Sequence, residues 1–173
     1  MKNTFTRTIT LSLIALMLIA SVALAQEKAE EAPKFKEIKT LAHTAPKSQG
    51  ASGTCWSFCT ISLLESELLR MGKEKVELSE MFPVYYSYIQ RAVVYMRTQG
   101  KNNFAQGGID NDVLWVARTF GLVRDEDYTG MWKDEKFINH GQMARGLKGM
   151  LDSMMKSKML SKKWKKAFVA TLD

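Results

Sequence analysis

The chain has 173 residues, of which 46% are hydrophobic and 25% charged, and its formal net charge is +7. This composition is typical of a globular protein and excludes a disordered or low-complexity chain. Two cysteines are too few to staple a small secreted scaffold with disulfides. The length suits one domain of ordinary size.

The first 25 residues have the pattern of a secretory signal peptide. Lys2 and Arg7 give a positive start, residues 9–20 are apolar, and small residues ending at Ala25 form a cleavage site. The apolar run is short for a membrane span, which takes about 20 residues. We expect cleavage after Ala25, a periplasmic or secreted protein and no stable membrane span after cleavage; an uncleaved anchor is the alternative. Residues 26–44 are expected to be a flexible lead-in.

A helix is predicted from the apolar residues that recur at three- and four-residue steps from Trp56 onward, until Gly72 stops the pattern after Met71. Cys55 would lie in its first turn, where unpaired N–H groups and the helix dipole favour the thiolate. Gln49 lies six residues earlier in a glycine-rich loop. Its amide could donate to an oxyanion that develops beside the sulfur.

Only Cys59 accompanies Cys55, four residues away on the same predicted helix. This spacing does not suit a disulfide, a redox pair would normally be C-x-x-C, and a metal site would lack further ligands. We therefore expect no metal and no cofactor. Cys59 is interpreted as a small buried residue on the core face. For Cys55 itself, a buried thiol without reactivity is the alternative to a nucleophile.

The segment Gln49-Gly50-Ala51-Ser52-Gly53-Thr54-Cys55-Trp56-Ser57-Phe58 resembles the nucleophile segment of papain-like cysteine peptidases. The resemblance covers residues 45–130 and implies that Cys55 is the nucleophile and that Gln49 lines the oxyanion hole. It also implies that Gly107, Gly108 and Trp56 contact an extended peptide substrate. The segment from Met81 to Gly100 and the turn Phe104-Ala105-Gln106-Gly107-Gly108 resemble the aminopeptidase C and bleomycin hydrolase branch more than papain.

Three features depart from the family pattern. Ser52 stands where papain has a disulfide cysteine, and Tyr85 and Tyr86 stand near the position of its partner. The family's histidine base and asparagine come from a C-terminal half, which we expect to lie beyond this chain. His140 in Asn139-His140-Gly141 superficially resembles the family's histidine context, but a helix-start or surface histidine is the preferred interpretation. His43 is expected to be exposed.

Further helices are predicted over residues 80–97, with Ser79 as N-cap, and from Asp110, as cap, to Gly121. The apolar side of the first contains Met81, Phe82, Tyr85, Tyr88, Ile89, Ala92, Val93 and Met96. Leu122-Val123 is a candidate short strand. We assign residues 45–132 to the helical domain of a papain-like peptidase.

Residues 133–173 contain ten Lys or Arg and four acids, whereas residues 26–132 contain thirteen and fourteen. Apolar residues at helical spacing predict two helices, one with Met143, Leu147 and Leu151 and one with Trp164, Phe168 and Leu172. Basic amphipathic helices can bind anionic membranes or nucleic acid. The preferred interpretation is a basic helical hairpin or insertion that packs on the domain, with no nucleic-acid partner.

Taken together, these patterns predict an α+β, papain-like fold of which this chain holds mainly the helical domain. The expected function is that of an exported, aminopeptidase-like cysteine peptidase acting on peptides or proteins. As an amino-terminal portion without the histidine and asparagine, it would be inactive alone, and a homo-oligomer is among the expected partners. The alternative is a noncatalytic peptide-binding remnant.

Overall fold

The structure is a computed structural model that describes residues 35–131, 135–157 and 163–173. The chain divides into two units, residues 1–40 and residues 41–173. Within the first unit, residues 35–40 are exposed and have no regular secondary structure. The predicted signal peptide lies outside the described residues. All further description concerns the second unit.

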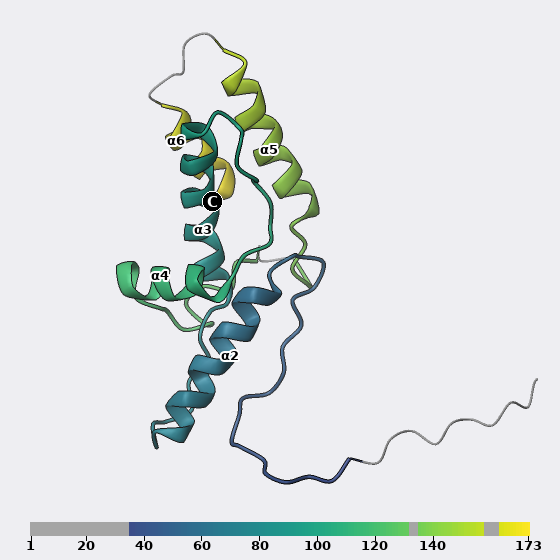
Figure 1. Cartoon of the computed structure of the whole chain (residues 1–173), viewed down its shortest axis with the longest axis vertical. Helices are drawn as coiled ribbons and strands as arrows, with labels where there is room; N and C mark the ends of the chain where they lie inside the picture. Colours follow the sequence, from purple (N-terminus) through teal and green to yellow (C-terminus); the bar gives the residue numbers. More distant parts are fainter. Residues whose placement is uncertain (1–34, 132–134, 158–162) are drawn as a thin grey trace, which may run out of the picture. The chain divides into compact units, whose positions relative to one another are not determined.

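Helices make up the regular structure of the second unit (Figure 1). In chain order they are α2 (Cys55–Arg70), α3 (Met81–Arg97), α4 (Asp110–Phe120), α5 (Gly141–Met155) and α6 (Trp164–Leu172). The described residues contain no strand, only two isolated bridges, Ala51 with Asn139 and Leu78 with Arg124. Of the predicted α+β fold, the described residues therefore represent the helical part.

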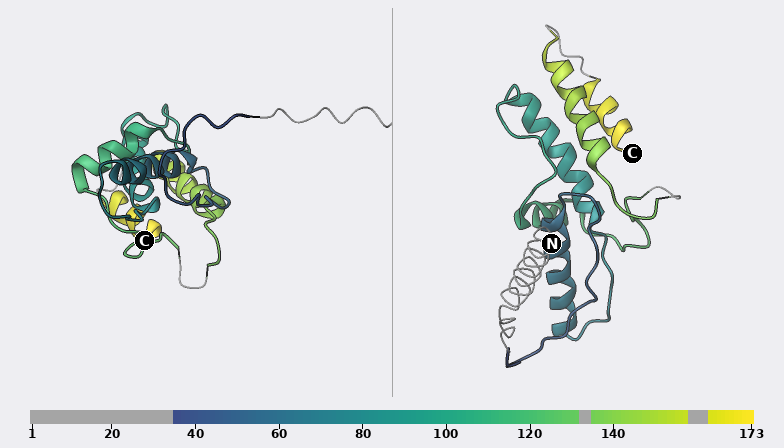
Figure 2. Two further views of the ribbon diagram at one scale, coloured as in Figure 1. Left: turned by 90° about the horizontal axis from the view of Figure 1, so that it is seen from below. Right: turned by 90° about the vertical axis from the view of Figure 1, so that its right-hand side faces the viewer.

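α3 is the central helix, because it contacts each of the other four. α4 packs against both α2 and α3, whereas α5 and α6 contact each other as well as α3 (Figures 1 and 2). Tyr88 and Ala92 of α3 meet Ile61 of α2, Val113 of α4 and other buried residues in one hydrophobic core. The start of α2 is thus anchored to a packed body.

The predicted ends of the helices are largely confirmed. α2 ends at Arg70, just before Gly72, and α4 ends at Phe120, just before Gly121. α3 begins at Met81 with Glu80 as its N-cap residue, one position later than predicted, but the Ser79 hydroxyl still accepts the Phe82 N–H at 3.0 Å. These signals are local, which explains why they can be read from the sequence.

Two details of the predicted elements are wrong. Asp110 is the first residue of α4 rather than its cap, and the Asp112 carboxylate instead accepts the Ile109 N–H at 3.2 Å. Leu122 and Val123 form no strand, since this segment makes only the isolated bridge between Leu78 and Arg124. A single bridge is too short to form a ladder.

The predicted core face of α3 also needs correction. The buried residues of this helix include Val84, Ser87 and Tyr95, which the apolar pattern did not contain, while Tyr85 and Val93 are only partly buried. The central position of α3 explains this, since partners on several sides bury more than one stripe.

The prediction that Cys59 is buried is wrong. Cys55 and Cys59 are both exposed, and Leu63, one turn further along α2, is 60% exposed. The buried residues of α2 are instead Trp56, Ser57, Thr60, Ile61 and Glu65. α2 has apolar residues on two sides, and α3 and α4 pack on only one of them.

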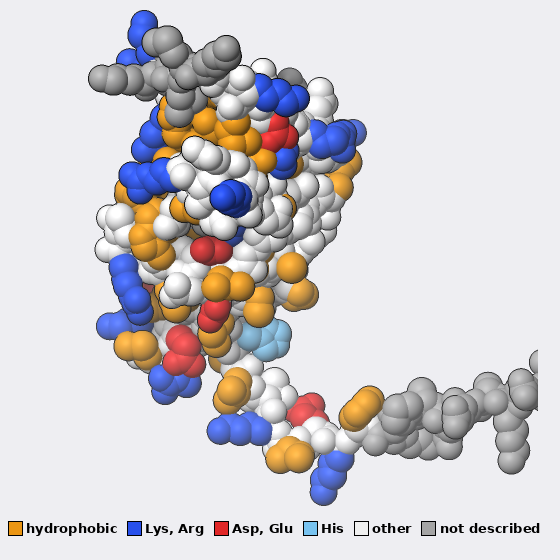
Figure 3. All heavy atoms as spheres, turned by 45° about the horizontal axis from the view of Figure 1, so that its top comes forward, with side chains coloured by type: hydrophobic (Ala, Val, Ile, Leu, Met, Phe, Trp, Pro, Cys, Tyr) orange, Lys and Arg blue, Asp and Glu red, His pale blue; other side chains and the backbone are white. Residues whose placement is uncertain are grey.

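The apolar stripes of the basic tail are buried by packing. Leu147 and Leu151 of α5 and Phe168 of α6 are 0% exposed and belong to the common core. Among the described residues, no helix is both long and apolar enough to cross a bilayer. On the face drawn in Figure 3, the Lys and Arg side chains are scattered rather than gathered into one patch. The boundary at residue 133 stays a prediction.

Candidate active site

The loop that leads into α2 is held together by its own side chains. The Gln49 amide donates to the Ser52 carbonyl at 2.5 Å, and the Ser52 hydroxyl donates to the Gln49 carbonyl at 2.7 Å. The Ser52 hydroxyl also lies 2.5 Å from that of Thr54, and both residues are buried. At the position where the resemblance implied a disulfide cysteine, Ser52 therefore ties the loop by hydrogen bonds.

Cys55 is the first residue of α2, exposed and free. The first N–H groups of a helix have no partner within the helix, and the first turn of α2 contains no acidic residue. These donors and the positive end of the helix dipole favour negative charge beside Cys55. Gln49 uses one amide hydrogen within the loop, so its second N–H remains available. The thiol of Cys55 thus follows directly on the loop that holds Gln49, and the role of Gln49 as an oxyanion donor stays a prediction.

Gln106 connects the loop before α2 to Gly107 and Gly108, the glycine pair that directly follows Gln106 in the chain. Its side-chain oxygen accepts the Gly53 N–H at 2.8 Å, and its carbonyl accepts the Trp56 indole N–H at 3.1 Å. These bonds span 50 or more residues of sequence. They place Gly107, the next residue, beside the start of α2.

Gly108 packs against the side of α2 that faces the core. A Cβ atom at this position would lie 2.6 Å from Cε2 of Trp56 and 2.3 Å from Nη2 of Arg91, so only glycine fits without displacement. Gly107 is exposed, and a Cβ atom there would meet nothing within 4 Å. Of the two glycines, Gly107 therefore presents the open backbone.

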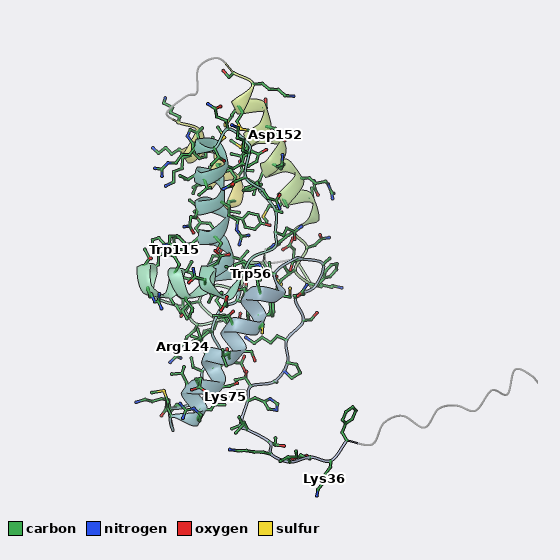
Figure 4. The ribbon with its side chains drawn as sticks, in the orientation of Figure 1. Lys36, Trp56, Lys75, Trp115, Arg124 and Asp152 are labelled. Carbon is green, nitrogen blue, oxygen red and sulfur yellow. The ribbon has the colours of Figure 1, made fainter. Side chains whose placement is uncertain are left out.

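Trp56 lies beneath the glycine pair, where the start of α2 approaches α4 (Figure 4). Its ring is 7% exposed, and the Arg91 guanidinium stacks on it at 5.1 Å from the centroid. Arg91 is held in turn by Asp112, 2.6 Å away. This arrangement makes Trp56 a support for Gly108, and its predicted contact with substrate stays a prediction.

A buried ion pair lies under the same helix. Lys47 Nζ is 3.0 Å from the Glu80 carboxylate and 4.0 Å from that of Glu65, and the Ser57 hydroxyl donates to the Glu80 carbonyl at 2.6 Å. Burial raises the pKa of Glu80, and the hydrogen bond and charge of Lys47 offset this only in part. Burial acts against the ammonium of Lys47, yet Glu80 raises the pKa of Lys47 overall.

Neither histidine contacts Cys55. His140 is the N-cap residue of α5, as the helix-start interpretation predicted, but it is buried at 8% exposure. Its Nδ1 has no hydrogen-bond partner and its ring lies 6.1 Å from that of Tyr88, in the lining of a cavity of about 40 Å³. Burial lowers the pKa of His140, although Glu135 opposes this. His43 is exposed and lies 2.8 Å from the Thr44 carbonyl.

Gln106, Arg91 and Asp112 belong to the surroundings of Cys55, although no sequence pattern pointed to them. Gln106 was only one letter of the glycine turn, and Arg91 was a charged residue beside the apolar positions of α3. No local signal marked Arg91, because its partial burial and its contacts with Trp56 and Asp112 arise only in the folded chain. The acidic partner, Asp112, lies 21 residues away in the chain, and the aromatic partner, Trp56, lies 35 residues away (91 − 56).

Comparison with known proteins now gives the family. The family described as Papain family cysteine protease matches residues 32–168. Oryzain beta chain from Oryza sativa subsp. japonica is 29% identical over 101 residues, which cover 57% of this chain and 20% of that protein. Cysteine protease 1 from the same organism is 32% identical over 83 residues, which cover 47% and 15%. The chain thus spans a fifth or less of these curated relatives, and it belongs to the papain family of cysteine proteases.

Proposed function

We propose that this chain carries the nucleophile of an exported cysteine peptidase that acts on peptides or proteins. The observation that carries the proposal is the exposed thiol of Cys55 at the start of α2, beside a loop that fixes Gln49. Membership of the papain family supports the reaction type. An aminopeptidase-like mode of action rests on the resemblance of residues 81–108 alone, and export rests on the signal pattern of residues 1–25.

In the proposed reaction, the Cys55 sulfur attacks the carbonyl carbon of a peptide bond. A C–S bond forms, and the carbonyl oxygen takes the negative charge, which the Cys55 N–H and the Gln49 amide stabilise. The C–N bond then breaks, and the leaving amine takes the proton that the Cys55 thiol has lost. Water releases the acyl group and restores the thiol. Removal of one such oxyanion donor typically costs about 10²–10³ in kcat.

The substrate would lie in an extended form along Gly107, whose backbone is open to hydrogen bonds. A groove of about 490 Å³ continues from Gln106 along α5, where Gly141, Ala144 and Gly149 leave room for a chain. Gln106, at one end of this groove, is hydrogen-bonded to Gly53 and Trp56, which lie on either side of Cys55 in the chain.

We assign the proton shuttle to a group outside this sequence, because His43 lies beside the Thr44 carbonyl and the His140 ring lies beside Tyr88 in the small cavity. We therefore expect little or no turnover from this chain alone. A noncatalytic peptide-binding protein is the second candidate. The positions of the two histidines favour this second candidate as well. The glycine turn and the groove along α5 could hold a peptide without cleaving it.

The test is covalent labelling by a peptidyl epoxysuccinyl probe, followed by mass mapping of the labelled residue in the longest natural product. Cys59 is a matched control, since it is also exposed and lies on the same helix. The peptidase proposal predicts rapid labelling of Cys55, slow labelling of Cys59 and protection by peptide. Equal labelling of the two, or an inert Cys55, would support the noncatalytic candidate instead.

A further inference from the structure

The exposed side of α2 carries both thiols of the chain. Cys55 and Cys59 are free and exposed, and they lie four residues apart on one regular helix. Residues at this spacing are neighbours on the same helix face, with Cβ atoms about 5–6 Å apart. A disulfide needs Cβ atoms about 3.5–4.5 Å apart, so these two sulfurs do not bond directly without unwinding the helix.

The same spacing suits an ion that bridges two sulfurs. A thiolate sulfur lies about 2.3 Å from a bound metal ion such as zinc. Two sulfurs on opposite sides of an ion at similar distances would therefore be roughly 4–5 Å apart. Side chains whose Cβ atoms are about 5–6 Å apart reach this separation by rotation about χ1.

The number of ligands around Cys55 and Cys59 indicates which type of ion can bind. Structural zinc requires four ligands, and among the described residues no three or more His, Cys, Asp or Glu gather into a metal-binding group. Two thiolates without further ligands suit a soft monovalent cation, for which Cu(I) is the biological example. Sequence analysis rejected a metal site for want of additional ligands, but a two-coordinate ion needs none.

The start of α2 favours the charge of such a complex. Two thiolates and one Cu(I) carry a net charge of −1, and the first turn of α2 has no acidic residue to repel it. The positive end of the helix dipole and its unpaired N–H groups act on the Cys55 side of the complex.

We propose that Cys55 and Cys59 form a two-coordinate thiolate site for Cu(I) on the exposed side of α2. On binding, two thiols release two protons and form two Cu–S bonds, and no electron is transferred. The site itself does not depend on peptidase activity. If the proposed function holds, the ion also occupies the electron pair with which Cys55 attacks a substrate, so that Cu(I) inhibits the peptidase reversibly.

The test is an anaerobic titration of the full chain with Cu(I), in competition with a chromophoric Cu(I) chelator. We expect one ion per chain and an X-ray absorption spectrum with two sulfur ligands. Cys59→Ser should weaken binding by about 10²-fold or more, because the second thiolate acts at a high effective concentration. The exposure of Cys59 makes this variant safe for folding.

A matched control keeps two thiols but moves one of them. In Cys59→Ser/Ser62→Cys, the second thiol lies at an exposed position seven residues from Cys55, about 10 Å along the helix axis. This variant should bind as weakly as Cys59→Ser. Binding as tight as that of the unaltered chain in either variant would overturn the proposal.

A second readout separates this site from the proposed function. One equivalent of Cu(I) should block epoxysuccinyl labelling of Cys55 in the unaltered chain and should have little effect in Cys59→Ser. If Cys55 resists the probe in both proteins while the titration still gives one ion, the copper site stands and the peptidase proposal fails. If the probe reacts but Cu(I) does not protect, the copper proposal fails alone.

Discussion

The two sides of α2 differ in what surrounds them. On one side, Trp56 contacts the glycine turn, Ser57 donates to Glu80, and Ile61 is 0% exposed in the core. On the other side, Cys55 and Cys59 are exposed and Leu63 is 60% exposed. The helix is thus held from one side and presents its thiols from the other.

One side of α2 therefore stabilises the domain, and the other side carries the reactive groups. Substitutions on the buried side should change the stability of the whole domain, whereas substitutions on the exposed side should change reactivity and leave stability almost unaltered. The following predictions test this difference between buried and exposed positions. Each is paired with a control in which a similar residue is substituted at an exposed position.

The largest effect is expected for Ile61→Ala. Loss of a fully buried side chain leaves a cavity and should lower the free energy of unfolding by about 2–5 kcal/mol. Leu63→Ala, on the exposed side, should change it by less than about 0.5 kcal/mol. Urea unfolding followed by circular dichroism measures both. Similar losses in the two variants would mean that the second side is also covered.

Gly108→Ala should destabilise through overpacking. The new methyl group would lie 2.6 Å from the Trp56 ring, and displacement of the ring should cost about 1–3 kcal/mol. Gly107→Ala meets nothing within 4 Å and serves as control. Thermal unfolding and Trp fluorescence report the two effects. An equal shift in both variants would contradict a specific fit of Gly108 against Trp56.

Lys47→Met removes one partner of the buried ion pair. The remaining Glu80 carboxylate is then buried without its cation, at a cost of about 1–2 kcal/mol, because Glu80 can take up a proton instead. The exposed pair of Lys75 and Glu77 provides the control, since Lys75→Met should change stability by less than about 1 kcal/mol. The loss in Lys47→Met should diminish toward acidic pH. A loss independent of pH would contradict the role of Glu80.

The smallest effect concerns pH. Because burial lowers the pKa of His140 below 6.5, the unfolded chain takes up a proton before the folded chain does. Stability should therefore fall as the pH drops below about 6.5 and level off below the lowered pKa of His140. His140→Gln should reduce the difference in unfolding free energy between about pH 7.5 and about pH 5. His43→Gln, at an exposed position, is the control variant. If His140→Gln left the dependence of the unfolding free energy on pH unchanged, the prediction would be contradicted.

The sequence predicted those parts of the site that depend on neighbouring residues. The position of Cys55 in the first turn of α2 and the end of that helix before Gly72 follow from local signals, and the structure has both. The start of α3 was predicted one residue too early, although Ser79 does accept a hydrogen bond from its first turn. The nucleophile segment also indicated the papain family, which the family comparison confirms.

The remainder depends on contacts between distant segments. Periodicity identifies the apolar positions of α2 but not which side is covered, so Cys59 was placed in the core although it is exposed. Likewise, nothing in the local sequence links Gln106 to Gly53 across 53 residues or Arg91 to Trp56. Only the arrangement of α2, α3 and α4 brings these residues together.

The hydrogen bond between the loop that leads into α2 and the segment before α5 has a consequence for the nascent chain during translation. Ala51 N–H donates to the Ile138 carbonyl at 2.8 Å, and Gly50, at a φ of +60°, allows the close approach, since a Cβ atom there would lie 2.3 Å from that oxygen. The loop can form this bond only after Ile138 has been synthesised, 83 residues after Cys55 (138 − 55). At about 5–20 residues per second, the ribosome takes roughly 4–17 s to supply them. A nascent chain thus exposes its thiol before the loop beside it can close.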